Sequence, residues 1–421
     1  MLKYQQLSPN FHLITNFSKD RFKTEFNLQF TAAGAWFEED SQRGVSHLLE
    51  HCILGRTKDL DFKGLKDYLF KENIYSNAAT GIMGMYLTLS GHKSDSDKML
   101  DLILEFGLKP TFSEDIQNQE REIVLREISE RRGDPNYRLY WEIAKQAFQP
   151  GSRYLCEVLG SAEDVRNSNL ETFQAIHHRM LNQSHVVLSV AGGIDDEQRL
   201  FDKIKTQSDL FGVNQALPVN YSPENKLHSF KYLPIVSDLA HEHAEITIYL
   251  PCPVKMDNRP ERYFIQQLLL RHPEGYLYNQ LRNELGLIYG LQSAYDQSLQ
   301  CLIIEMSCEI KYIPQIVDKV KEVFSDFEKV YKPEKAKILK QISVKKQEMS
   351  QDEPQAVAEF LVDNLTDFGV PMTFTEYVKQ LDKVNDELIS DVYHAIQSGL
   401  PQIQIVASSN NHELEAVSIN L

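Results

Sequence analysis

Two histidines and a glutamate lie close together near the start of the chain, in the segment His47-Leu48-Leu49-Glu50-His51. On a helix, residues three and four positions apart share a face, so both imidazoles and the carboxylate would lie together. Two imidazoles one turn apart can bind one zinc ion, and a neighbouring carboxylate can deprotonate a metal-bound water. This HxxEH pattern predicts a hydrolytic metal site, with a coincidental polar face as the alternative.

A catalytic zinc site needs a third protein ligand and one open position. The acidic stretch 113–132 is predicted to be helical, and its carboxylates are the candidates: Glu114, Asp115, Glu120, Glu122, Glu127 and Glu130. Glu120 and Glu127 are seven residues apart, so they lie on one face of that helix. The residue types and their spacing do not choose between these two. Any carboxylate on such a helix can also be a solvated surface group.

Strands and helices in the first half of the chain must position these side chains. Alternation of polar and apolar residues predicts strands over residues 3–15, 24–34 and 185–191, around Asn77 and over 85–89. Helical periodicity predicts helices over residues 44–54, 62–71, 95–107, 113–132, 136–148 and 164–181. In the second half we expect a strand over 246–250, two strands within 287–308 and a strand over 403–407. We expect helices there over 260–271, 275–285 and within 312–397.

The two halves share one order, in which a strand leads through a polar loop into a helix and later strands precede a run of helices. This order predicts an α+β protein of two similar α/β-sandwich domains, each a mainly antiparallel sheet covered by helices. Gly212, Pro218 and Pro223 lie among polar residues over 206–226 and predict a linker, which we place at 216–228. The expected domains are therefore residues 1–215, which carry the metal motif, and 229–421.

Composition excludes several classes of function. The 421 residues include 44 Lys and Arg against 60 Asp and Glu, a formal net charge of −16. An acidic chain without a basic block is a poor ligand for nucleic acid or for an anionic membrane surface. No apolar run is long enough for a membrane span, and no targeting signal is evident, so we expect a cytoplasmic protein. Five widely spaced cysteines predict buried reduced thiols rather than disulfides.

The segments around the histidines resemble the pitrilysin or insulinase family of zinc peptidases, which includes the mitochondrial processing peptidases. The resemblance rests on FTAAGAWFEE at 30–39, GVSHLLEH at 44–51 and GRT at 55–57, and it extends over about residues 10–420. The family's ligand glutamate follows the second histidine by about 76 residues, the position of Glu127. The resemblance implies one zinc ion per chain, held by His47, His51 and Glu127, with Glu50 activating a zinc-bound water.

The same resemblance implies further site residues. Glu120 corresponds to a glutamate that supports a histidine ligand from outside the metal's own ligand set. Asn77 and Ala78 lie in a segment similar to the family's substrate-edge strand, which pairs with an extended peptide. Arg282 and Tyr289, seven residues apart, resemble a pair that contacts the substrate carbonyl and stabilises the tetrahedral intermediate. By themselves, Arg282 would be a solvated helix residue and Tyr289 a half-buried strand residue.

For function, the resemblance implies a zinc-dependent endopeptidase that hydrolyses peptides or unfolded polypeptides inside a closed, clam-like chamber. Short family members pair, so we expect a homodimer, with a heterodimer of related chains as the alternative. Two other functions stay open: a non-catalytic peptide-binding or scaffold subunit, and a protease dedicated to one precursor peptide. Inactive relatives usually lose members of the zinc motif, which this chain retains.

Two further features of the sequence are a pair of histidines and a cysteine. His241 and His243 flank Glu242 and share one face of a possible strand, which favours a solvated edge over a second metal site because no third ligand is evident. Cys52, directly after His51, departs from the family's pattern and is expected to pack within its helix.

Overall fold

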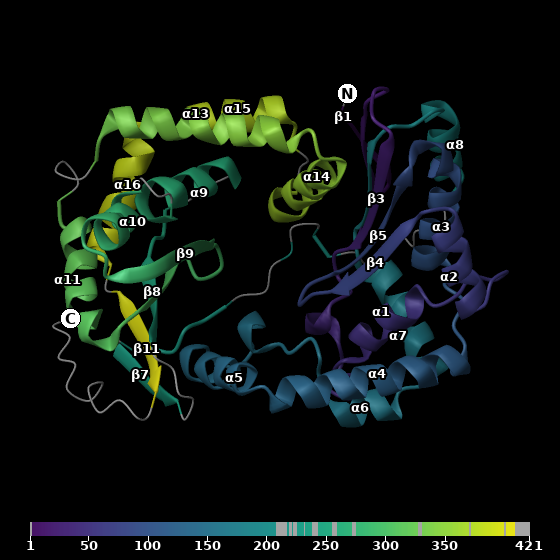
Figure 1. The fold of residues 1–421 in the computed structure, drawn as a ribbon, viewed down its shortest axis with the longest axis horizontal. Helices are drawn as coiled ribbons and strands as arrows, with labels where there is room; N and C mark the ends of the chain where they lie inside the picture. Colours follow the sequence, from purple (N-terminus) through teal and green to yellow (C-terminus); the bar gives the residue numbers. More distant parts are fainter. Residues whose placement is uncertain are drawn as a thin grey trace. The chain divides into compact units, whose positions relative to one another are not determined.

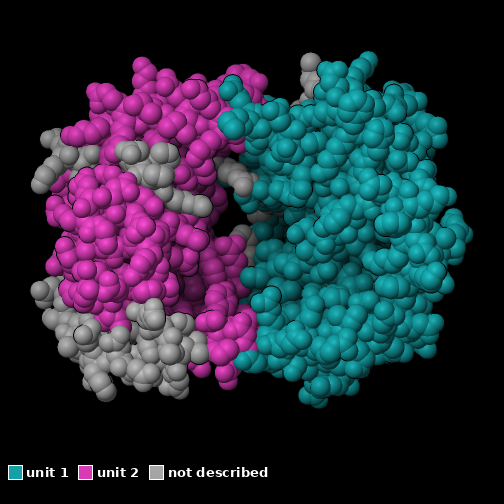
Figure 2. Space-filling model, viewed as in Figure 1, with its two compact units in different colours: residues 1–133, 156–221, 348–373 teal, residues 134–155, 222–347, 374–421 magenta. Residues whose placement is uncertain are grey.

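The computed structural model describes residues 2–207, 217–218, 221, 225–230, 232–237, 243–254, 259–271, 275–326, 331–369, 372–399 and 401–408. The chain divides into two compact units (Figure 2). Each unit contains one sheet and the helices that pack on it. Unit 1 comprises residues 1–133, 156–221 and 348–373, and unit 2 comprises residues 134–155, 222–347 and 374–421. The predicted α+β class is confirmed.

Unit 1 contains a six-stranded sheet with the strand order β1-β2-β6-β3-β5-β4. Its strands are β1 (Leu2–Ser8), β2 (Phe11–Phe17), β3 (Lys23–Phe30), β4 (Tyr75–Thr80), β5 (Met85–His92) and β6 (Val186–Gly192). Strands β2 and β6 are parallel, and the other neighbours are antiparallel. Strand β4 lies at one edge and pairs with β5 on one side.

Helices cover both faces of this sheet (Figure 1). The unit 1 helices are α1 (Val45–Ile53), α2 (Phe62–Lys71), α3 (Ser96–Leu108), α4 (Glu114–Gly133), α6 (Ala162–Asn167), α7 (Leu170–Gln183), α8 (Glu197–Gln207) and α14 (Pro354–Phe368). The main core joins Phe26, Leu28 and Phe30 of β3 to α1, α3, α4 and α7. On the opposite face, α14 packs against Ile14 and Val187.

Unit 2 contains a five-stranded sheet with the order β7-β11-β8-β10-β9, in which only β7 and β11 are parallel. Its strands are β7 (Tyr232–Ser237), β8 (Ala244–Pro251), β9 (Ile288–Asp296), β10 (Cys301–Cys308) and β11 (Gln402–Ser408). Its helices are α5 (Pro135–Ala147), α9 (Arg259–Gln266), α10 (Tyr276–Tyr278), α11 (Ile313–Val323), α13 (Pro333–Ser350), α15 (Phe374–Lys383) and α16 (Asp386–Ser398). Short 3-10 turns lie at Ala35–Phe37, Lys93–Asp95, Arg153–Leu155 and Ile310–Tyr312.

Two helices are exchanged between the two halves of the chain: each packs on the sheet formed mainly by the other half. Helix α5 precedes residue 215 but packs on the unit 2 sheet, where Ala144 and Phe148 contact Tyr249 and Ile303. Helix α14 follows residue 229 but packs on the unit 1 sheet. Much of the predicted linker 216–228 lies outside the described residues.

Two sequence predictions are wrong at turns. Residues 3–15 form two antiparallel strands rather than one, because Pro9 has no N–H for a ladder and the chain reverses at Pro9-Asn10. The helix predicted over 164–181 is divided into α6 and α7. The Asn169 side chain accepts a hydrogen bond from the Thr172 amide at 2.9 Å, and this capping box starts a new helix.

The helices predicted over 260–271 and 275–285 are α-helical only in part. Residues Gln267–Arg271 and Asn279–Glu284 are π-helical. The second segment ends before Gly286, whose φ of +64° is a left-handed conformation that favours glycine.

Within the described residues, no helix has the length and apolarity to cross a membrane. The five cysteines are unpaired, and all but the half-buried Cys156 are buried.

A buried carboxylate fixes the start of α1. Glu38 is only 5% exposed, and its two oxygens accept hydrogen bonds from the Gly44 amide at 2.8 Å and the Ser46 amide at 2.6 Å. Gly44 has φ of +90°, and a Cβ there would lie 2.3 Å from the Leu159 carbonyl oxygen. Burial raises the pKa of Glu38, and the two amide hydrogen bonds oppose that rise. The first amides of α1 are therefore satisfied by a side chain that lies outside the HxxEH motif.

We expect Glu38→Gln to lower the free energy of unfolding by about 1–3 kcal/mol, because the amide NH2 would face one of the two backbone donors. Chemical denaturation measures this loss. Glu39→Gln is the matched control, since Glu39 is exposed and adjacent. Equal stability of the two variants would contradict the capping role.

Candidate metal centre

Helix α1 divides its residues between the core and a polar face. Its buried apolar residues are Val45, Leu48, Leu49, Cys52 and Ile53. The expectation that Cys52 packs within the helix is confirmed, because it is 4% exposed. With that side anchored in the core, His47, Glu50 and His51 lie together on the other side, as the helical period requires.

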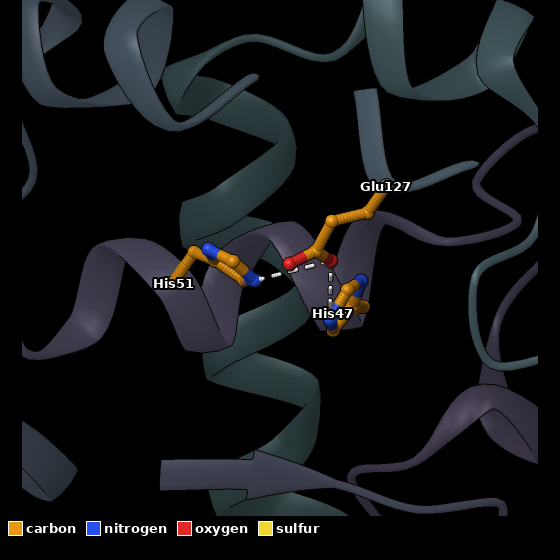
Figure 3. Close-up of side chains that lie close together, drawn as sticks. All are labelled: His47, His51 and Glu127. Carbon is orange, nitrogen blue, oxygen red and sulfur yellow. Dashed lines mark ion pairs between the residues drawn. The ribbon is translucent and has the colours of Figure 1, made fainter. Parts of the chain in front are cut away.

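The structure brings His47, His51 and Glu127 together (Figure 3). Nε2 of His47 lies 3.7 Å and Nε2 of His51 lies 3.8 Å from Oε2 of Glu127. One ligand atom from each residue lies within 4.8 Å of the others. Tetrahedral ligands at zinc's usual bond lengths are separated by about 3.3–3.5 Å, so a small adjustment would let all three bind one ion. Two imidazoles and a carboxylate are also a donor set that suits catalytic zinc.

The two histidines have different surroundings. Burial and the neighbouring His51 lower the pKa of His47 to about 4, which keeps its imidazole neutral, as a metal ligand must be. Burial also lowers the pKa of His51, but the hydrogen bond to Glu120 and the charges of Glu50 and Glu127 outweigh it, so that pKa lies above its usual value.

Glu120 holds His51 from behind. Its Oε2 lies 3.1 Å from Nδ1 of His51, while Nε2 of the same ring faces Glu127. A proton on Nδ1 donates to Glu120 and leaves Nε2 free to bind a metal. Nδ1 of His47 is buried and has no hydrogen-bond partner among the residues that the structure describes.

Glu50 connects this centre to the edge of the sheet. Its Oε2 lies 4.0 Å from Nε2 of His47 and accepts a hydrogen bond from the Thr80 amide at 3.1 Å. Burial raises the pKa of Glu50, although the charge of His51 and the Thr80 hydrogen bonds lower it. Thr80 is the last residue of β4, so the carboxylate beside the histidines is tied to the edge strand.

Asn77 and Ala78 lie in the middle of that edge strand. Asn77 is exposed and pairs with Thr88 of β5, and Ala78 is half-buried against the core. In the part of the chain that the structure describes, β4 has no partner strand on its other side. Its outer backbone edge can therefore pair with an added strand.

Arg282 and Tyr289 lie in unit 2. Nη1 of Arg282, in the second π-helical segment, donates to the carbonyl oxygen of Ile288 at 2.8 Å, directly before Tyr289. Tyr289 is 50% exposed, and its ring centroid lies 4.4 Å from that of His243. His241 and Glu242 lie outside the described residues, so the solvated edge expected for this segment stays a prediction.

Comparisons with known proteins show similarity to a family of peptidases that includes zinc proteases. Residues 27–153 match the profile described as Insulinase (Peptidase family M16), and residues 167–332 match the profile described as Peptidase M16 inactive domain. An uncharacterized zinc protease of Rickettsia bellii is 25% identical over 269 residues, which cover 62% of each chain. The match thus spans less than two thirds of that relative.

Two further relatives extend the comparison. A probable mitochondrial-processing peptidase subunit beta of Arabidopsis thaliana is 27% identical over 202 residues, covering 44% of this chain and 38% of that protein. The crystal structure of a protease from Helicobacter pylori superposes with a TM-score of 0.73 at 17% identity, covering 96% of this chain and 99% of the other, which shows a shared fold. The chain belongs to the insulinase family of peptidases.

Proposed function

We propose that this protein is a zinc-dependent endopeptidase that hydrolyses peptides or unfolded polypeptides. The observation that carries the proposal is the convergence of His47, His51 and Glu127 from two helices, with Glu50 beside them. Membership of a family that includes zinc proteases supports the identity of the metal. Each chain would hold one zinc ion.

His47, His51 and Glu127 would hold the ion. When bound, zinc lowers the pKa of a bound water toward about 7 and polarises the scissile carbonyl. Glu50 takes the proton of the attacking water and passes it to the leaving amine. Its half-buried position and its hydrogen bond from Thr80 hold the carboxylate in one orientation for both transfers. Glu120 keeps the proton of His51 on Nδ1.

The peptide would extend along β4, with its backbone paired near Asn77 and Ala78. That strand ends at Thr80, which binds the Glu50 carboxylate, so a paired peptide would pass the general base. From unit 2, Arg282 and Tyr289 would donate hydrogen bonds to the developing oxyanion. We accordingly propose residues 1–215 as the catalytic domain and 229–421 as the substrate-binding domain of a chamber formed by a homodimer.

A non-catalytic peptide-binding subunit is the second candidate function. The description of the profile matching residues 167–332 as an inactive domain favours it, as does the similarity to a peptidase subunit. A heterodimer would accompany that function. A protease dedicated to one precursor peptide differs only in specificity, which cleavage of a peptide library measures. The cytoplasmic location stays a prediction.

We expect Glu50→Gln to keep its zinc and to lose cleavage by at least about 100-fold, because glutamine cannot accept the water's proton. Metal analysis and a quenched fluorescent peptide library measure the two properties. Glu130→Gln, an exposed change on α4, is the control. Equal cleavage by Glu50→Gln and wild type would refute the mechanism, and a zinc-loaded but inactive wild type would support the subunit function.

We expect Glu120→Gln to weaken zinc binding by about 10–100-fold, because a neutral amide supports the His51 tautomer less well than a carboxylate. Competition with a chelator of known affinity measures the change. Glu122→Gln is the matched control, since Glu122 lies on the same helix and is exposed. Unchanged zinc affinity in the Glu120 variant would contradict the supporting role.

A further inference from the structure

Unit 2 contains a cavity of about 740 Å³ that the proposed mechanism does not use. It lies between α5 and the face of the sheet that α5 covers. In unit 1 the equivalent helix, α14, packs on its sheet through a continuous apolar cluster. In unit 2, the C-terminal end of α5 makes apolar contacts with Tyr249 and Ile303. Nearer its N-terminal end, α5 makes apolar contacts with Ile235 and Val406. Residues of α5 and of β8, β9, β10 and β11 line the cavity beside these contacts.

Two carboxylates lie on the floor of this cavity. Glu305 of β10 lies opposite Thr247 of β8. Two residues further along, Glu245 of β8 lies opposite Ser307 of β10. The two glutamates are therefore diagonal neighbours on one face, about 7–8 Å apart between Cα atoms. Burial and the charge of Glu305 raise the pKa of Glu245, and the charge of His243 opposes that rise. Both side chains are exposed to the cavity, and neither forms a salt bridge with any described residue.

Aromatic rings form the wall beside the carboxylates. The rings of Phe148 and Tyr154 are stacked with centroids 4.3 Å apart, and Tyr249 meets Phe148 edge to face at 6.1 Å. The Tyr154 hydroxyl donates to the buried Asp296 at 2.7 Å, which holds the ring in place. Tyr140 and Tyr278 also line the cavity. The wall is thus arranged before any ligand enters.

One largely buried side chain of this wall has a hydroxyl that no described residue contacts by a hydrogen bond. Tyr249 is 4% exposed and lines the cavity, and its hydroxyl makes no hydrogen bond with a described residue. The charge of Glu305 contributes, after burial, to the raised pKa of Tyr249, so the two groups lie near each other. This hydroxyl and the two carboxylates can therefore contact a polar ligand in the cavity.

We propose that this cavity binds an organic cation, an alkylammonium or guanidinium group, between the two glutamates and the tyrosine wall. Two carboxylates that form no salt bridge with a described residue supply the charge, and aromatic faces favour an organic cation over a hydrated metal ion. The cation comes either from a lysine or arginine side chain of a peptide, which rests on the proposed function, or from a free amine.

Calorimetric titration of the full-length Glu50→Gln protein tests the proposal, because that variant leaves added peptides intact. The probes are an acetylated peptide with one central lysine, the same peptide with norleucine, and free spermidine. We expect the lysine peptide or spermidine to bind, and the norleucine peptide to bind at least about tenfold more weakly. Binding of the lysine peptide alone identifies a substrate subsite, and binding of spermidine alone identifies a small-amine site. Equal binding of both peptides without spermidine binding overturns the proposal.

Variants of the cavity complete the test. Glu245→Gln combined with Glu305→Gln removes the charge, and Gln292→Lys places a fixed cation on the exposed floor. Both changes should weaken binding of the cationic probe by at least about tenfold, whereas Glu334→Gln, elsewhere in unit 2, should not. Cationic binding that survives in folded variants refutes the cavity. The titration needs no cleavage, so loss of peptidase activity alone refutes only the proposed function.

Discussion

The candidate centre depends on how α1 and α4 meet. Both helices bury apolar residues in the unit 1 core, α1 through Leu48 and Leu49 and α4 through Val124 and Ile128. Their polar faces are thereby turned toward each other, and three carboxylates and two imidazoles gather there: Glu50, Glu120, Glu127, His47 and His51. No lysine or arginine in the described part of the chain forms an ion pair with them. A divalent cation would offset this concentration of negative charge.

The residues that hold α1 in place come from distant parts of the chain. Glu38 caps its first turn, Glu120 of α4 binds His51, and Thr80 of β4 binds Glu50. These contacts join a loop, a helix and an edge strand to one short helix. Because each contact ends on a site side chain or on the backbone that carries it, the scaffold restricts the positions of the reacting groups.

The two exchanged helices, α5 and α14, cover their sheets to different extents. Helix α14 covers the unit 1 sheet with valine and leucine side chains and leaves that face to the core. Helix α5 covers its own sheet in part and presents Tyr140 to a cavity floored by glutamates. Similar sheets can therefore carry different chemistry, since the residues of one covering helix decide whether the face is filled or open.

Local interactions made much of the fold predictable. The helices over 44–54, 62–71, 95–107 and 113–132 are confirmed, because their periodic apolar residues pack on one core. The turn at Pro9-Asn10 and the cap at Asn169 also depend on local chemistry, which apolar periodicity alone does not detect. The π-helical segments and the exchange of α5 and α14 depend on packing with residues far away in sequence.

By itself, the sequence determined that His47, Glu50 and His51 share a helical face, because the α-helical period alone decides this. Its spacing left Glu120 and Glu127 equivalent, and only their resemblance to a known family distinguished them. The tertiary structure placed Glu127 between the Nε2 atoms and Glu120 behind Nδ1. It also decided that Glu38 caps α1 and that unit 2 contains an acidic, aromatic cavity. These features require the packing of distant segments, and no local period encodes that packing.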